Sequence, residues 1–166
     1  MAQSDPELTP YDVEAAYLYN FGKFVQWPVD SASSSQPFSI CILGEDNFGR
    51  KLDDLIADDT IQGRKIVARR LSSPDSADNC QIVFIGLSED AHLKKDIDAL
   101  EKRPILTVSN LPHFLERGGM IQFLQQNRRV RFAVNLSAAE QTHLSMSSEL
   151  LKVAIYVNRP ATQEVE

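Results

Sequence analysis

Short apolar runs that alternate with amphipathic segments limit most strongly how this chain can fold. The apolar runs, each followed by glycine or serine, are Phe38–Leu43, Cys80–Ile85 and Ile105–Val108, and Lys65–Leu71 after Gly63 predicts a further strand. Such runs predict strands that are buried on both faces of a sheet. We therefore predict a single three-layer α/β domain over residues 9–158, with a mixed, mostly parallel sheet and helices on both faces. Residues 1–8 and 159–166 are expected to be flexible termini.

The segments around the apolar runs predict the other elements. A first helix is expected after the capping residue Thr9, with an end before Trp27–Pro28. Its expected buried stripe is Val13, Tyr17, Phe21 and Phe24. Further helices are expected over Asp46–Ala57, Ser88–Leu100, Leu111–Arg117 and Ser147–Val157. Met120–Leu124 and Arg129–Val134 predict a hairpin around polar residues 125–128.

Composition excludes several classes of protein. The chain has 166 residues, of which 43% are apolar and 24% are charged, so disorder is excluded for most of it. The net charge of -6 disfavours binding to nucleic acid or to an anionic membrane, because such binders usually carry a basic excess. No apolar run approaches the roughly 18 residues that a membrane helix needs, so we do not expect insertion into a membrane.

The first residues do not form a targeting segment. Met1–Asp5 is polar and lacks a basic stretch followed by an apolar run. This pattern fits a cytosolic protein, and it equally fits the mature form of an exported protein with an added initiator methionine. Composition leaves both compartments open.

No group of residues matches the pattern of a catalytic or metal site. His92, His113 and His143 have no second ligand at a zinc spacing such as H-E-x-x-H. The segment Gly44–Gly49 has the outer glycines of a phosphate loop but lacks the Lys-Ser/Thr pair that contacts phosphate and magnesium. A G-x-S-x-G elbow is also missing. We therefore expect no enzymatic activity, no cofactor and no tightly held metal.

The cysteines and the arginine cluster permit two interpretations each. Cys41 and Cys80 both lie in predicted strands, and their spacing fits either a disulfide or two buried free thiols. Arg129 and Arg131 share one face of a predicted strand, and Val130, Phe132 and Val134 share the other. The arginine face fits either a solvated surface or a contact with an acidic partner or anion.

Several short motifs, taken together, resemble the YfiR family of bacterial periplasmic proteins. The motifs are residues 16–28 (AYLYNFGKFVQWP), 40–44 (ICILG), 80–85 (CQIVFI), 105–109 (ILTVS), 118–121 (GGMI), 129–136 (RVRFAVNL) and 150–154 (LLKVA). One such motif is weakly specific. Seven in the right order, over Val13 to Val157, are a strong signal.

The resemblance implies a fold, a compartment and a function. The family has an α/β domain with a covered central sheet, and its members carry a signal peptide, so this chain resembles the mature periplasmic form. Members are non-enzymatic regulators that form homodimers. The best-known role is repression of a YfiN-type inner-membrane diguanylate cyclase through its periplasmic region. A YfiB-type outer-membrane lipoprotein sequesters the repressor, cyclic di-GMP then rises, and biofilm formation is favoured.

The resemblance also implies roles for particular residues. Cys41 and Cys80 match the cysteines of a structural disulfide in the family, which an oxidising periplasm permits. The stretch from residue 121 to 139 matches the region of repressor contacts. Its expected partner-binding residues are Ile121, Phe123, Arg131, Ala133, Asn135 and Ala139.

The chain departs from the family pattern at two places. A second cysteine pair occurs in members near the positions of Leu115 and Gln122, and it is absent here. The family motif Arg-Phe-Glu-Ile-Asn has Ala133 in place of the acid and Val134 in place of isoleucine. A cyclase contact through that acid would therefore differ in this protein.

A second interpretation comes from a different class of function. The chain fits a periplasmic small-molecule sensor or solute-binding module that acts on another membrane signalling protein. Such a module would use the aromatic first helix or the face formed by Arg129 and Arg131.

Overall fold

The predicted apolar runs become the central strands of the sheet. The computed structural model describes residues 9–28 and 36–159. Its main sheet contains β2 (Phe38–Leu43), β3 (Thr60–Ile61), β4 (Arg64–Leu71), β5 (Ile82–Ile85), β6 (Leu106–Ser109), β7 (Ile121–Gln126), β8 (Arg129–Asn135) and β10 (Tyr156–Asn158). A separate two-stranded sheet pairs β1 (Val25–Gln26) with β9 (Ser145–Met146).

Seven helices accompany the strands of the described residues. The α-helices are α1 (Pro10–Phe24), α2 (Arg50–Ile56), α3 (Leu93–Leu100), α4 (Leu136–Gln141) and α5 (Ser148–Val153). Two short 3₁₀ helices are η2 (Pro74–Ser76) and η3 (Leu87–His92).

The order of the main sheet is β10-β8-β7-β6-β5-β2-β4-β3. Neighbours from β4 through β7 are parallel, β7 and β8 form an antiparallel hairpin, and β10 lies parallel to β8. The chain starts at β2, continues to β4 on one side, and then returns past β2 to β5 on the other. This is the doubly wound arrangement of open α/β sheets.

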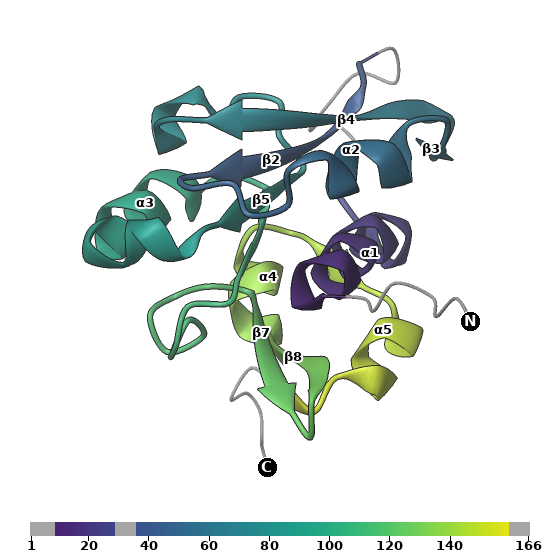
Figure 1. Ribbon diagram of the computed structural model, residues 1–166. Helices are drawn as coiled ribbons and strands as arrows, with labels where there is room; N and C mark the ends of the chain where they lie inside the picture. The colour runs from purple at the N-terminus through teal and green to yellow at the C-terminus, as the bar shows by residue number, and fades with distance from the viewer. Residues whose placement is uncertain (1–8, 29–35, 160–166) are drawn as a thin grey trace, which may run out of the picture.

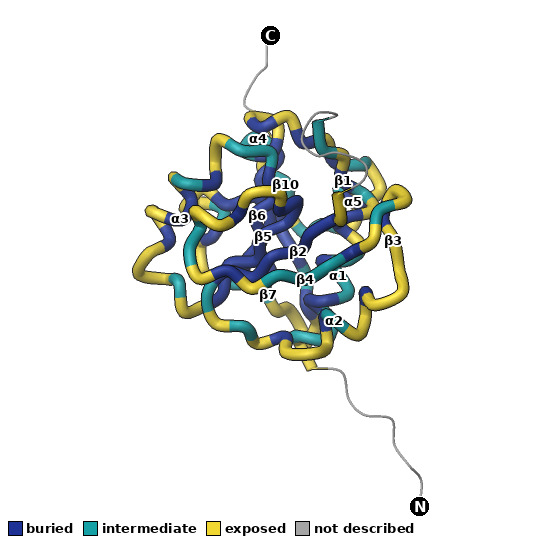
Figure 2. The backbone as a smooth tube through the Cα atoms, turned by 90° about the horizontal axis from the view of Figure 1, so that it is seen from above, coloured by how far each residue is buried: buried dark blue, intermediate teal, exposed yellow. Residues whose placement is uncertain are grey.

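Two apolar clusters lie on opposite faces of the sheet. One joins α1, α2 and α5 to the sheet through residues such as Leu18, Leu52 and Leu150. The other joins α3 to the opposite face through Leu93 and Ile97. Figure 1 shows α3 at the left of the sheet and α1, α2 and α5 at the right. Figure 2 shows the central strands buried between these layers and the exposed residues at the periphery. The predicted single three-layer domain with a mixed, mostly parallel sheet is confirmed.

The first helix begins where its local signals predict. Thr9 caps α1 by accepting a hydrogen bond from the backbone N–H of Asp12, whose carboxylate accepts one from the backbone N–H of Thr9. The expected buried stripe is only partly correct. The buried residues of α1 are Glu14, Ala15, Leu18, Phe21 and Gly22, whereas Val13, Tyr17 and Phe24 are half-buried at its sides.

The structure corrects three predicted helices. The expected helix from Asp46 begins only at Arg50, because the Asp46 carboxylate accepts hydrogen bonds from the backbone N–H groups of Phe48 and Gly49 in a turn. Residues 111–117 form turns, and His113 has a φ of 60° that an α-helix does not permit.

The third correction concerns the end of the chain. The expected final helix, Ser147–Val157, ends at Val153, and residues 156–158 form β10 instead. The N–H of Ile155 donates to the carbonyl of Phe132, which directs the chain along β8. Strand pairing with a distant edge has therefore replaced continued helix.

A disulfide joins Cys41 of β2 to Cys80, two residues before β5. Both cysteines are buried in the cluster beneath α3, and the pairing implied by the family resemblance is thus present. Nothing is described for the expected flexible ends apart from Arg159, since residues 1–8 and 160–166 lie outside the described residues. Within residues 9–28 and 36–159, no helix has the length and apolar character to cross a membrane.

Candidate functional site

The β7–β8 hairpin carries most of the residues that the sequence assigned to partner binding. Its connection is the two-residue turn Asn127–Arg128, and both residues have positive φ, 52° and 68°. Positive φ at both central residues is typical of the type I′ turn, whose twist matches that of paired strands. This turn fixes the register in which Phe123 lies opposite Phe132 and Gln122 lies opposite Ala133.

Alternation along the hairpin gives it two different faces. Phe123 and Phe132 point toward α1, where both rings contact Phe21 at centroid distances of 5.9 and 5.2 Å. Val130 and Val134 are buried in the same cluster. The predicted division of β8 into an arginine face and an apolar core face is therefore correct.

The outer face of the hairpin forms a groove of about 330 Å³, which we call the hairpin groove. Its lining comes from the 111–117 turns and from β7, β8 and β10, namely Leu115, Glu116, Gln122, Leu124, Ala133, Tyr156 and Asn158. Gln122, Ala133 and Tyr156 lie in one row across three strands, because each pairs with the next. Ala133 forms the floor of the groove, since its short side chain leaves the space above it open.

Asn135 fixes the end of the hairpin groove. Its side-chain oxygen caps α4 by accepting a hydrogen bond from the N–H of Ala138 at 3.1 Å, and it also accepts one from the amide of Asn158 at 3.2 Å. Its own amide donates to the carbonyl of Leu115 at 3.4 Å. One buried side chain therefore connects β8, α4, β10 and the 111–117 turns.

Arg129 and Arg131 share the outer face of β8 with Ala133, whereas Glu116 is the only charged residue among those that line the groove itself. Arg131 lies opposite Leu124 on the outer face and is half-buried, whereas Arg128 and Arg129 at the turn are exposed. Within the part of the chain that the structure describes, none of these three forms an ion pair. Their guanidinium groups are thus available for carboxylates of a partner, and the apolar floor beside them is available for its apolar side chains.

The structure corrects the placement of several expected contact residues. Ile121, Phe123 and Ala139 are 0%, 2% and 0% exposed, so they belong to the core and touch no partner in this conformation. The alternation of Ile121 and Phe123 with outward residues was visible in the sequence, but the face that α1 covers was not. Arg131 and Ala133 lie on the outer face, where Ala133 is only 7% exposed, and Asn135 supports the groove from within. Partner binding by this stretch stays a prediction.

The positions of the missing second cysteine pair lie together at the groove. The backbone N–H of Leu115 donates to the side-chain oxygen of Gln122 at 3.2 Å. A neutral hydrogen bond therefore connects the two positions at which family members carry cysteines. It holds the turn segment against β7 without redox chemistry.

No pattern in the sequence indicated Tyr156 and Asn158 as lining residues. Tyr156 was assigned to the final helix and Asn158 follows that helix directly, and only the parallel pairing of β10 with β8 brings them to the groove. Tyr156 is 58% exposed, and its large ring forms the outer wall of the groove. Exposed aromatic side chains beside arginines are typical anchors of protein interfaces.

The aromatic residues of α1 serve the core. The Tyr17 ring packs against Phe132 at 5.3 Å, and its hydroxyl donates to the carbonyl of Val130 at 3.2 Å. Phe21 is fully buried beneath Tyr17, so the inner part of the stripe is packed against the sheet. The core-packing interpretation of the stripe is therefore the better one.

One buried acid of α1 escaped the sequence analysis. Glu14 is 4% exposed, and its only hydrogen-bonding partner in the described chain is the amide of Asn110, at 3.3 and 3.5 Å. Burial raises the pKa of Glu14 to about 7. The acid faces a cavity of about 300 Å³ beside Tyr11, Leu87 and Phe123. Its sequence neighbours Val13 and Ala15 did not indicate that the acid itself is buried.

The structure also bears on metal binding and catalysis. Among the described residues, no group of three or more His, Cys, Asp or Glu side chains is placed to hold a metal ion. The three histidines lie apart and exposed, in η3, in the 111–117 turns and after α4. The absence of enzymatic activity stays a prediction.

Comparison with known proteins agrees with this geometry. The model of a family described as YfiR/HmsC-like matches residues 11–155. Among solved structures, a conserved domain protein from Vibrio cholerae O1 biovar El Tor is similar, with a TM-score of 0.59 and 13% sequence identity over 91% of this chain. This chain spans 61% of the length of that protein. At this identity the similarity supports the fold alone.

Proposed function

The chain belongs to the YfiR/HmsC-like family, as its motifs predicted, and we propose that it is a periplasmic regulator that represses a YfiN-type diguanylate cyclase. The repressor binds the periplasmic region of the cyclase in the inner membrane. Repression keeps cyclic di-GMP low and limits biofilm formation. The protein itself performs no chemistry in this role.

The hairpin groove is the observation that carries the proposal. It combines an apolar floor at Ala133 and Leu124 with the exposed ring of Tyr156, and Arg131 lies on the same face of β8, two residues before Ala133. Large aromatic groups and arginines around a small apolar depression are the features that anchor protein interfaces. The chain as a whole carries a net charge of -6, so the cluster of Arg128, Arg129 and Arg131 stands out as a contact for an acidic partner surface.

Release of the cyclase follows from competition at the same groove. A YfiB-type outer-membrane lipoprotein binds the repressor and removes it from the inner membrane. Because both partners bind the same groove, binding of one excludes the other. The two partners are held in different membranes, so binding to the lipoprotein also removes the repressor from the inner membrane. The working form is expected to be a homodimer, which sedimentation or light scattering of the purified protein measures directly.

The substitution Ala133→Arg tests the groove. An arginine at this position fills the space above the floor, while the opposite face of β8 keeps Phe132 and Val134 in the core. The variant should fold, as judged by circular dichroism and a melting temperature close to that of the wild type. Its affinity for the periplasmic region of the cognate cyclase should fall at least about tenfold, a loss of about 1.4 kcal/mol. Cyclic di-GMP in cells should rise.

A matched control uses the exposed alanine Ala57 after α2, on the opposite side of the sheet. Ala57→Arg adds the same charge and volume away from the groove, and it should bind and repress as the wild type does. If Ala133→Arg folds and still represses, the interface lies elsewhere. If it unfolds the protein, position 133 belongs to the core and the groove assignment fails.

A further inference from the structure

A second polar depression lies at the carboxyl ends of the parallel strands. The ends of β2, β4 and β5 are level, because Leu43 pairs with both Leu71 and Ile85. The connection after β2 carries α2 to the face of α1, whereas those after β4 and β5 carry η2 and α3 to the opposite face. The crevice lies on the α3 face between the connections that follow β4 and β5, the two strands that flank β2. In open α/β sheets, ligands bind outside the carboxyl ends of the strands.

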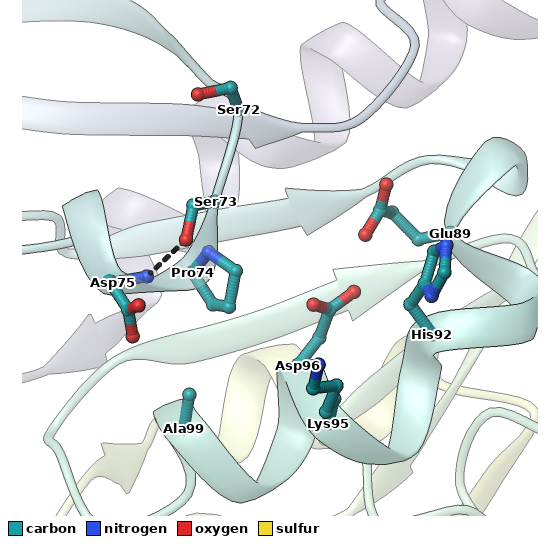
Figure 3. A pocket seen from close by; sticks show the side chains of 9 residues that line it. All are labelled: Ser72, Ser73, Pro74, Asp75, Glu89, His92, Lys95, Asp96 and Ala99. Atoms are coloured by element: carbon teal, nitrogen blue, oxygen red, sulfur yellow. Dashed lines mark hydrogen bonds between the residues drawn. The ribbon is translucent and has the colours of Figure 1, made fainter.

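We call this depression the carboxyl-end crevice. Its volume is about 490 Å³, within the usual range for small-molecule sites of roughly 300–1,000 Å³. Figure 3 shows its lining side chains, which come from η2 and the residues before it, from η3 and from α3. They are Ser72, Ser73, Pro74, Asp75, Glu89, His92, Lys95, Asp96 and Ala99.

Asp96 gives the crevice an unsatisfied acceptor. The residue is only 3% exposed, and its Oδ2 has no hydrogen-bond partner among the described residues. Figure 3 shows its carboxylate directed into the crevice toward that of Glu89. A buried carboxylate without a donor is costly, and native structures rarely leave one without a partner. A ligand with N–H donors would supply what the chain itself does not.

Glu89 is held firmly opposite Asp96. The Cα of Gly44 lies so close that a Cβ there would be 2.8 Å from the Cγ of Glu89, so a larger residue would displace the acid. The hydroxyl of Ser88 accepts a hydrogen bond from the backbone N–H of Glu45 at 2.8 Å, which ties η3 to the end of β2. Arg117 forms an ion pair with Asp90 at 2.7 Å and fixes η3 from the other side.

From this geometry we propose that the carboxyl-end crevice binds a small aliphatic ammonium compound, whose charged nitrogen lies between Glu89 and Asp96. An ammonium group has three N–H donors, and the carboxylates of Glu89 and Asp96 each accept from one of them. A metal ion fits less well, because the described residues contain no group of three or more His, Cys, Asp or Glu side chains arranged as ligands.

The charges around the crevice favour a diamine over a monoamine. Asp75 contributes a third carboxylate from η2, and Lys95 is the only lysine or arginine among the lining residues. With Glu89 and Asp96 ionised, the lining carries more negative than positive charge. A second ammonium group at the far end of a short chain would therefore meet Asp75.

Proton binding at the crevice competes with the amine. Burial, and then the neighbouring Glu89, raise the pKa of Asp96 to about 7, whereas Lys95 lowers it slightly. The other groups that face it are His92 on η3 and Asp75 on η2. Near neutral pH the acid pair shares a proton that an ammonium group displaces. Amine binding therefore releases a proton and strengthens as the pH rises toward about 8.

Titration calorimetry with 1,4-diaminobutane on the whole chain tests the proposal. We expect saturable binding of one molecule per chain at about pH 8. The affinity should be at least about tenfold weaker at about pH 6, because each pH unit below the pKa costs about a factor of ten. The heat should vary with the ionisation enthalpy of the buffer, since a proton is released. 1-Aminobutane should bind more weakly, and 1,4-butanediol should not bind.

Two variants and a matched control complete the test. Asp96→Asn and the half-buried Glu89→Gln should each weaken diamine binding at least about tenfold. Asp98→Asn makes the same change on the exposed side of α3, where Asp98 forms an ion pair with Lys94, and should bind as the wild type does.

Several outcomes would overturn the proposal. The first is that the wild type shows no saturable binding at millimolar diamine, and the second is that folded Asp96→Asn or Glu89→Gln binds the diamine normally. The third is that 1,4-butanediol binds as tightly as the diamine. The fourth is that Ca²⁺, and not the amine, binds in a manner that depends on Asp96. No cyclase is present in this experiment, so its result is independent of the proposed repressor function.

Discussion

The parallel half of the sheet and the hairpin half differ in how they are covered. Strands β2 and β5 have apolar clusters on both faces, with α1 and α2 on one side and α3 on the other. The β7–β8 hairpin has its apolar cluster only on the α1 side, and its outer face carries the hairpin groove. A sheet covered on both faces can offer a site only at the ends of its strands, whereas a sheet covered on one face can offer the face itself.

The difference explains where the two proposed sites lie. The carboxyl-end crevice occupies the ends of β4 and β5, and its polar groups come from connections rather than from strands. The hairpin groove lies on the strands, and its residues alternate with core residues. A small ligand suits the first place, and the surface of another protein suits the second. The following predictions test this division of the molecule.

The largest expected effect compares the two faces of the hairpin. Phe123→Ala removes a ring that is 2% exposed and packs against Phe21 and Tyr17, so it should lower the free energy of unfolding by about 3–5 kcal/mol. Leu124→Ala, on the half-buried outer face, should cost less than about 1 kcal/mol. Urea denaturation followed by circular dichroism measures both. Equal losses would mean that the outer face is also core.

The second effect concerns the disulfide of the parallel half. Cys41 and Cys80 close a loop with a sequence separation of 39, which the chain-entropy model values at about 4 kcal/mol. Cys41→Ser should therefore destabilise the protein by up to that amount. The double variant Cys41→Ser/Cys80→Ser should lose no more free energy of unfolding than the single variant does. Mass spectrometry of unreduced wild type should find no free thiol; two alkylatable thiols in periplasmically expressed protein would contradict the pairing.

The third and smallest effect is a pH dependence that originates beside the hairpin half. Glu14 has a folded pKa of about 7 and an ordinary pKa of 4.5, so the folded state binds more protons than the unfolded state between these values. The contribution of Glu14 to the free energy of unfolding is therefore fully present below pH 4.5, and it is lost as the pH rises through 7.

Replacement of Glu14 tests this dependence. Glu14→Gln should remove the decline and raise stability at about pH 8 by about 1–3 kcal/mol. Glu140→Gln, an exposed glutamate of α4, is the matched control and should leave the pH profile unchanged. Denaturant titrations at several pH values measure both variants. An unaltered profile in Glu14→Gln would assign the buried acid no role in the pH dependence.

Local signals in the sequence determined much of the fold. The apolar runs predicted β2, β5 and β6, and the segment after Gly63 predicted β4. Thr9 predicted the start of α1, and the polar residues 125–128 predicted the hairpin. These features depend on a residue and its neighbours in the chain, through strand burial, capping and turn conformation. The family motifs, which depend on residue identity, likewise predicted the YfiR/HmsC-like match and the Cys41–Cys80 pair.

Only the tertiary structure decided which residues form the sites. Tyr156 reaches the hairpin groove because the open edge of β8 pairs with a segment that the sequence assigned to a helix. Ile121 leaves the expected surface because α1 covers its side of the sheet, and Ala139 leaves it because α4 directs it into the same apolar cluster. Glu89 and Asp96 line a crevice only because η2, which follows β4, packs against α3. Each outcome depends on contacts between residues far apart in the chain or on which face another element covers, and local periodicity carries no information about either.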